Sequence, residues 1–251
     1  MSRHQDVRGR PGRRIPTLLC AVLFCAAAAW LAFAGGATRA QTTTAGFNLT
    51  GHNNTASPVT ATTINPNLDT TAQPVQLSNV GPNLVLQSHA NSYFAKGWPT
   101  ATSLTPTQNY FTFTIAPKAG DQITLNSMSL NVANDNQGPT RFVVRTSLDN
   151  FASDAATPFT LAPGGQGPSL YNFNFSQQGP FTSPIEFRMY GYAAAMSNSH
   201  LWLESTATTP NAISLTGSVT PVPEPPAVLA VGAVALGLLG LARRARRAPA
   251  A

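Results

Sequence analysis

The chain has little cysteine and little charge, and each shortage excludes a class of protein. Its 251 residues contain two cysteines, Cys20 and Cys25, and both lie near the N-terminus. The rest of the chain therefore has no disulfide framework, no cysteine zinc site and no thiol nucleophile. Only 10% of the residues are charged, against about 25% in an average soluble protein.

The net charge of +6 belongs to the two ends of the chain. Six arginines and Asp6 give residues 1–40 a net charge of +5, and four arginines and Glu224 give residues 222–251 a net charge of +3. Residues 41–221 carry five basic and seven acidic side chains, a net charge of −2. We therefore expect no nucleic-acid partner, because such a domain carries a basic patch.

Residues 1–40 have the three-part order of a secretory signal peptide. A basic segment over 1–14 is followed by an uncharged apolar run from Ile15 to Phe33 and then by small residues up to Ala40. Positive charge stays in the cytoplasm while the apolar helix inserts. We predict export with cleavage after Ala40, with Ala37 as the second choice. An uncleaved membrane anchor is the alternative, because the apolar run is long.

Residues 222–251 have the pattern of a C-terminal membrane anchor. The prolines of residues 223–226 hold the chain extended, and residues 227–242 contain no polar side chain. As a transmembrane helix this run spans about 24 Å, and arginine snorkelling covers the shortfall from a bilayer core of about 30 Å. The four arginines that follow, within residues 243–247, should remain cytoplasmic, which places residues 41–221 outside. A buried globular helix is the less favoured alternative.

This tail resembles the PEP-CTERM sorting domain. The matching residues are the motif Pro223, Glu224 and Pro225, the glycines Gly232, Gly237 and Gly240 of the apolar span, and the cluster Arg243, Arg244, Arg246 and Arg247. Pro226 departs from the family, which more often has Ser, Ala or Thr there. The resemblance implies that an exosortase, a membrane-embedded enzyme similar to cysteine transpeptidases, processes the chain. It further implies a Gram-negative bacterium that makes exopolysaccharide, transient anchoring in the cell membrane, and transfer to the cell surface or extracellular matrix.

Residues 41–221 are predicted to form one all-β domain, a jelly-roll-like β-sandwich. Apolar residues alternate over 111–115, 123–125 and 128–132, which is the period of a half-buried strand. The three-residue step from Leu125 to Met128 predicts a β-bulge at Asn126-Ser127. Further strands are expected around residues 142–144, 171–175, 185–189, 201–203 and 213–215, with an edge strand around 47–49. Turn residues separate these runs, and neither a helical run nor a fixed repeat interrupts them.

Alternation along these strands directs Arg145, Arg188, Tyr190, Tyr192 and Trp202 away from the core. We expect one surface to present them together. Aromatic rings beside hydrogen-bonding groups suit sugars, which stack their C–H faces and offer hydroxyl groups. Exopolysaccharide is therefore the candidate ligand. The alternative is an ordinary solvated sheet face with one cross-strand Arg–Glu pair.

Catalysis finds little support in the central domain. His52, His89 and His200 lack metal-type spacing, and no G-x-S-x-G elbow occurs. Carboxylates for glycoside hydrolysis could come from Asp149, Asp154, Glu186 and Glu204, but no pattern ties two of them together. Residues 134–138 offer oxygen ligands for calcium without a complete calcium loop, so a turn is favoured.

We expect no cofactor, no metal site and no enzymatic activity. The chain is predicted to be an exported surface or matrix protein with a structural or carbohydrate-binding β-sandwich. A secreted carbohydrate-active hydrolase and a module that only packs in the matrix are the alternatives.

The tail yields the first prediction. If an exosortase cuts near the Pro-Glu-Pro motif, the mature protein lacks Arg243 to Arg247. Mass spectrometry of the extracellular fraction should find a C-terminus upstream of the arginine cluster. An intact C-terminus ending at Ala251 in that fraction would contradict this processing.

Overall fold

The computed structural model describes residues 42–53, 55–105, 109–161, 164 and 167–222. These residues form strands and loops, with one 3₁₀ turn at Ser147–Asp149. Among them, no helix is long and apolar enough to cross a bilayer. The predicted signal helix and the predicted tail helix lie outside the described residues.

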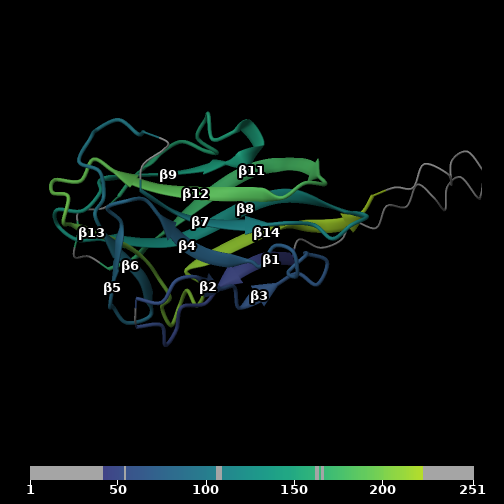
Figure 1. The fold of residues 1–251 in the computed structure, drawn as a ribbon, viewed down its shortest axis with the longest axis horizontal. Helices are drawn as coiled ribbons and strands as arrows, with labels where there is room; N and C mark the ends of the chain where they lie inside the picture. The colour runs from purple at the N-terminus through teal and green to yellow at the C-terminus, as the bar shows by residue number, and fades with distance from the viewer. Residues whose placement is uncertain (1–41, 54, 106–108, 162–163, 165–166, 223–251) are drawn as a thin grey trace, which may run out of the picture. The chain divides into compact units, whose positions relative to one another are not determined.

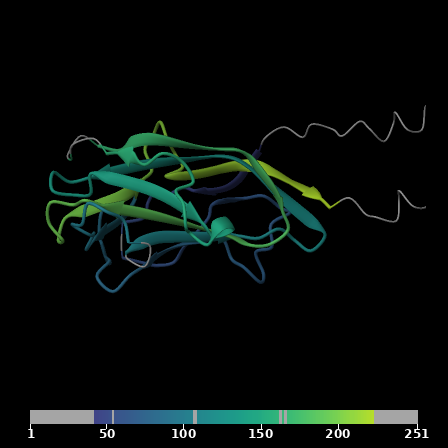
Figure 2. The same ribbon diagram turned by 90° about the horizontal axis from the view of Figure 1, so that it is seen from above.

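The described strands form two antiparallel sheets (Figures 1 and 2). The eight-stranded sheet has the order β3-β1-β14-β8-β13-β6-β5, with β11 also paired to β8. Its strands are β1 (Thr42–Phe47), β3 (Thr63–Ile64), β5 (Val85–Gln87), β6 (Ser92–Lys96), β8 (Asp121–Asn134), β11 (Ser169–Phe181), β13 (His200–Glu204) and β14 (Ile213–Pro221).

The six-stranded sheet has the order β10-β9-β12-β7-β4-β2. Its strands are β2 (Val59–Thr60), β4 (Gln76–Val80), β7 (Tyr110–Ile115), β9 (Arg141–Thr146), β10 (Phe159–Thr160) and β12 (Ile185–Tyr192). The predicted edge strand around 47–49 is β1, which ends at Phe47 and lies between β3 and β14 rather than at an edge.

The long strand β8 organises the eight-stranded sheet. One edge of β8 pairs with β11 from Ile123 to Val132. The other edge pairs with β14 from Asp121 to Leu130 and then with β13 from Val132 to Asn134. The register with β14 shifts at Asn126, because Leu125 faces Gly217 while Ser127 faces Thr216. The predicted bulge is therefore confirmed.

The two sheets pack face to face through aromatic side chains. The Phe113 ring of β7 lies 5.3 Å from the Phe47 ring of β1 and 4.9 Å from the Phe187 ring of β12, measured between centroids. Phe175 of β11 reaches Phe187 from the opposite sheet at 6.0 Å. All four side chains are buried. Burial of such rings supplies much of the hydrophobic free energy of a sandwich, and the predicted β-sandwich is confirmed.

Strands β4, β5 and β6 are absent from the sequence-based expectations. The pattern of β6 explains this, because Tyr93 and Phe94 are adjacent aromatic residues that point to opposite faces. Tyr93 is buried in the core, whereas Phe94 is half-buried on the outside. Alternation of apolar and polar residues fails wherever the outer face of a strand is itself aromatic.

Tyr93 joins the two layers by a partly buried hydrogen bond. Its hydroxyl lies 3.1 Å from Oδ1 of Asn79 on β4 and 2.8 Å from Oγ of Ser57. Its ring meets Phe111 of β7 edge to face at 5.0 Å. Burial raises the pKa of the Tyr93 phenol to about 12, although the hydrogen bonds to Ser57 and Asn79 oppose the shift.

The raised pKa predicts a loss of stability at alkaline pH. An unfolded tyrosine ionises near 10, so the folded protein binds the Tyr93 proton more tightly. The resulting contribution, about 3 kcal/mol, is fully present below pH 10 and is lost as the pH rises from 10 to 12. Urea unfolding across this range should show the loss. Tyr93→Phe, which has no phenol to ionise, should lose less stability over the same range, and an equal loss in both proteins would contradict the assignment.

Candidate functional site: an aromatic platform and a polar pocket on the eight-stranded sheet

The five predicted site residues lie on two different sheets. Arg145 is on β9 and Arg188, Tyr190 and Tyr192 are on β12, all on the outer face of the six-stranded sheet. Trp202 is on β13, on the outer face of the eight-stranded sheet. The outer faces of a sandwich point in opposite directions, so the structure does not bring Trp202 together with the other four. Alternation shows which residues of one strand share a face, but not which sheet the strand joins.

The tyrosines of β12 belong to a covered apolar cluster. Tyr190 is 0% exposed and packs with Val143 and Tyr110, while Leu104 and Tyr192 cover the cluster from its margin. Burial raises the pKa of Tyr190 and of Tyr110 above the ordinary value. A buried ring cannot stack on a sugar. Tyr190 therefore contributes to packing on this face and is not accessible to a ligand.

Arg188 is held between two aromatic rings. Its guanidinium carbon lies 3.6 Å from the Phe151 ring centroid and 4.7 Å from that of Tyr110. Nε of Arg188 donates to Oε1 of Glu186 at 2.7 Å. Burial by itself lowers the pKa of Arg188, but hydrogen bonds to Glu186 and Tyr190 outweigh it and raise the pKa above its usual value. The group is a fixed cation that stacks on the protein's own rings.

Arg145 is similarly engaged beside it. Arg145 faces Arg188 across the two strands, and its Nε donates to Oδ1 of Asp154 at 2.7 Å. Its Nη1 donates to the carbonyl oxygen of Phe151 at 3.1 Å. The two arginines therefore hold the loop after the 3₁₀ turn against the sheet. The Arg–Glu pair that forms joins Arg188 to Glu186, two residues apart on one strand, rather than across two strands as the alternative expected.

Trp202 stands in a group of four aromatic side chains on the opposite side of the sandwich. We call His89, Phe94, His200 and Trp202 the aromatic platform. Phe94 stacks with His89 at 5.0 Å and with His200 at 4.7 Å, and Trp202 lies 5.0 Å from Phe94 and 5.4 Å from His89. Three of them come from paired strands, because β13 places Trp202 opposite Phe94 and His200 opposite Lys96.

Polar contacts fix the orientation of the platform rings. Nε1 of Trp202 donates to Oε2 of Glu204 at 2.8 Å. Nδ1 of His200 lies 2.8 Å from Oδ2 of Asp135, and Nδ1 of His89 lies 3.0 Å from Oγ of Ser92. A pre-oriented indole offers a flat apolar surface at little entropic cost, as a sugar-binding platform requires.

The sequence pattern identified only one member of this platform. Phe94 went unnoticed because β6 was not recognised as a strand, and His89 precedes that strand in a loop. His200 was considered only as a metal ligand. The available signal was the run Ser92-Tyr93-Phe94-Ala95-Lys96, in which one of two adjacent aromatic residues must face outward in any strand.

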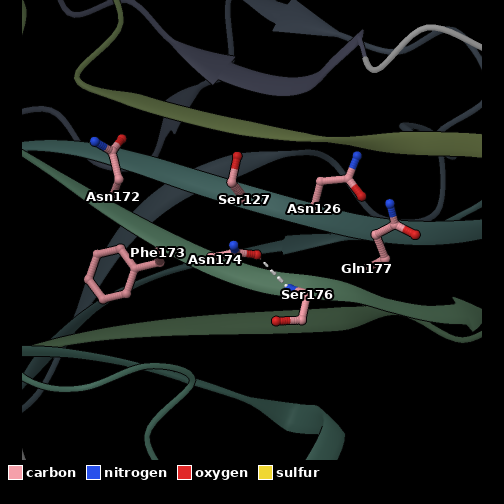
Figure 3. Close-up of a pocket in the computed structure, with 7 residues that line it drawn as sticks. All are labelled: Asn126, Ser127, Asn172, Phe173, Asn174, Ser176 and Gln177. Atoms are coloured by element: carbon pink, nitrogen blue, oxygen red, sulfur yellow. Dashed lines mark hydrogen bonds between the residues drawn. The ribbon is translucent and has the colours of Figure 1, made fainter.

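A polar pocket of about 650 Å³ lies further along the same face, beside the bulge of β8. Figure 3 shows its lining residues on the two paired strands β8 and β11, with the Phe173 ring pointing away from the amide groups. The lining residues are Asn126, Ser127, Asn172, Phe173, Asn174, Ser176 and Gln177. Ser176 and Gln177 have φ values of 50° and 58°, so β11 also bulges where it passes the pocket.

The four carboxylates considered for hydrolysis each have a local partner. Glu186 binds Arg188, Asp154 binds Arg145, and Glu204 accepts from Trp202. Asp149 accepts a hydrogen bond from the backbone N–H of Ser153, and its pKa is lowered chiefly by the Ser153 side chain. Residues 134–138 form the predicted turn, with the N–H of Gly138 bonded to the carbonyl oxygen of Asp135. No group of three or more potential metal ligands occurs in the described part of the chain.

Comparison with known proteins shows only distant likenesses of fold. No family model matches the chain, and no curated protein matches it. Among solved structures, it is similar to a family 29 carbohydrate-binding module from Piromyces equi, at 12% identity over 71% of this chain and 91% of that one, with a TM-score of 0.32. A structure described as "CBM4 structure and function" gives 9% identity, 59% and 91% coverage and a TM-score of 0.37.

A third similar structure is a family two carbohydrate esterase from Cellvibrio japonicus. It is 10% identical over 59% of this chain and 33% of that one, with a TM-score of 0.29. At such low identities and TM-scores these likenesses carry no argument about function. The function must be argued from the geometry of this chain.

The Arg188 contacts predict a structural role that can be separated from ligand binding. Arg188→Ala removes the ion pair with Glu186 and uncovers the Phe151 and Tyr110 rings, so we expect a loss of about 2 kcal/mol in the free energy of unfolding. Arg141→Ala is the matched control on the same face, because Arg141 is exposed and bonds only the Thr160 hydroxyl through its side chain among the described residues. The control should change stability by less than about 0.5 kcal/mol. Equal urea midpoints for the two variants would contradict this role.

Proposed function

We propose that this chain is an exported surface or matrix protein whose β-sandwich binds carbohydrate on the aromatic platform. The observation that carries the proposal is the aromatic platform, in which polar contacts orient Trp202, His200 and His89 and all three rings pack on or beside Phe94. Sugars present apolar C–H faces and many hydroxyl groups, so an oriented indole beside carboxylate, serine and lysine groups is complementary to them. The chain is proposed to bind its ligand without catalysing a reaction.

The position of the platform suits a domain that is anchored by its ends. Thr42 pairs with Gly217, and Pro221 pairs with Asp121 at the start of β8. Trp202 pairs with Ala133 near the other end of the same strand. The fourteen residues of β8 correspond to about 40 Å. A tether at Val222 would therefore leave the platform far from the point of attachment.

Sorting through the tail is the second part of the proposal. We propose that the signal peptide exports the chain and that the apolar span of residues 227–242 anchors it with the C-terminus in the cytoplasm. An exosortase then recognises Pro223, Glu224 and Pro225 and passes the domain to the cell surface or matrix of a Gram-negative bacterium. Exopolysaccharide, made in the same place, is the proposed ligand of the platform.

Substitution of Trp202 tests the binding function. Trp202→Ala removes the indole from the platform, and we expect the affinity for the producing organism's polysaccharide to fall about tenfold, since about 1.4 kcal/mol of stacking is lost. Tyr192→Ala, which removes a partly exposed ring from the opposite sheet, is the matched control and should bind normally. Retention of the full exported protein on immobilised polysaccharide measures both variants.

Two results would count against the platform as the binding site. The first is unchanged retention of Trp202→Ala. The second is equal loss in Trp202→Ala and Tyr192→Ala, which would point to a general effect on folding. Thermal unfolding of each variant distinguishes a folded protein that has lost its ligand from one that has lost its structure.

A further inference from the structure

We infer that the ligand is a neutral, linear glycan segment several sugars long, which lies along β8 from the aromatic platform to the polar pocket. This inference rests on the proposed function, since it assigns the ligand class of the same face. The observations that carry it are the placement of both sites on one side of the sheet, the lack of cationic side chains between them in the described part of the chain, and the unused hydrogen-bonding groups in the pocket.

The platform and the pocket lie on the same outer side of the eight-stranded sheet. Met128, Leu130 and Val132 of β8 are buried in the core, so the alternate residues point outward. These are Ser127 and Ser129, which are partly exposed, and Asn131 and Ala133, which are only 3% and 4% exposed because neighbouring residues cover them. Ala133 faces Trp202 of the platform, whereas Ser127 faces Asn174 of the pocket.

The distance between the two sites excludes a single sugar ring. Ala133 lies six positions after Ser127 on β8, which corresponds to about 20 Å along the strand. One monosaccharide cannot reach both sites, but an extended oligosaccharide can. The strand direction therefore sets the direction in which the glycan would run.

Among the described residues, the stretch between the two sites has no cationic side chain, and Glu204 of β13 lies beside Asn131, whose side-chain amide donates to the Glu204 carbonyl oxygen. The outward residues of β14 and β11 that flank β8 there are Ser214, Thr216, Leu170, Asn172 and Asn174. Leu170 is 51% exposed and adds an apolar contact beside Asn131. Lys96 and Asp135 lie at the platform end. Without a row of cations, the face has nothing to pair with a polymer of acidic sugars.

The pocket holds amide groups that the described fold does not use. The side chains of Asn126 and Gln177 make no hydrogen bond to another described residue. Asn172 and Asn174 accept bonds through Oδ1, from Ser129 at 2.7 Å and from the N–H of Ser176 at 2.7 Å. Their NH₂ groups remain available as donors. Uncharged amides provide both donors and acceptors, which hydroxyl groups of a neutral sugar can satisfy.

Chain-length dependence of binding tests this inference. The probes are disaccharides and hexasaccharides from cellulose, laminarin and mannan, with oligogalacturonate as the acidic comparison, and the protein is the full exported chain. We expect a neutral hexasaccharide to bind more tightly than its disaccharide and more tightly than oligogalacturonate. The double variant Asn126→Ala, Gln177→Ala should bind that hexasaccharide about tenfold more weakly and the disaccharide with unchanged affinity.

A matched control separates loss of the pocket from loss of fold. Gln76→Ala removes an amide from the six-stranded sheet and should bind both probes normally. Equal hexasaccharide affinity in the double variant and the unaltered protein would overturn the extended ligand while leaving the platform intact. Preference for oligogalacturonate would overturn its neutral character. Failure of Trp202→Ala to weaken any probe would instead overturn the proposed function.

Discussion

The pairing of β8 with three other strands is the constraint on which the rest of the structure depends. Its fourteen residues pair with β11 along one edge. Along the other edge they pair first with β14 and then with β13. This shared edge brings residues 200–204 and 213–221 into one sheet. Since both edges are satisfied by backbone hydrogen bonds, β8 is protected from solvent along its length. Its outer face therefore becomes a long, fixed surface rather than an exposed edge.

The bulge at Asn126 turns this regular surface into a site with a recess. A bulge leaves one residue unpaired and locally increases the twist of the strand. On β8 it shifts the register of pairing with both β11 and β14. Beside the bulge, β11 has two residues of positive φ, Ser176 and Gln177. The resulting pocket is lined by amides and hydroxyl groups. The polar pocket thus lies where the backbone is irregular. The aromatic platform lies mainly on the regular strands β6 and β13.

The two outer faces of the sandwich carry similar types of residue, but these residues have different roles on each face. On the six-stranded sheet, arginine and tyrosine side chains pack on one another and on Phe151, and they hold a loop and a covered apolar cluster in place. On the eight-stranded sheet, the rings of His89, Phe94, His200 and Trp202 pack beside one another without a covering cluster of that kind in the described residues. Composition alone does not distinguish the two faces. The exposure of an aromatic ring decides whether it only packs within the protein or is also available to a ligand.

The sequence by itself determined the β-sandwich, most of its strands, the bulge at Asn126-Ser127 and the outward direction of Trp202. These follow from the two-residue period of a strand and from its interruption, which are local properties. The signal and the sorting tail are likewise local patterns, and they remain predictions because they lie outside the described residues. Only the tertiary structure decided which strands share a sheet. That choice depends on long-range pairing, and it separated Trp202 from the arginines and joined it to Phe94, more than a hundred residues earlier in the chain.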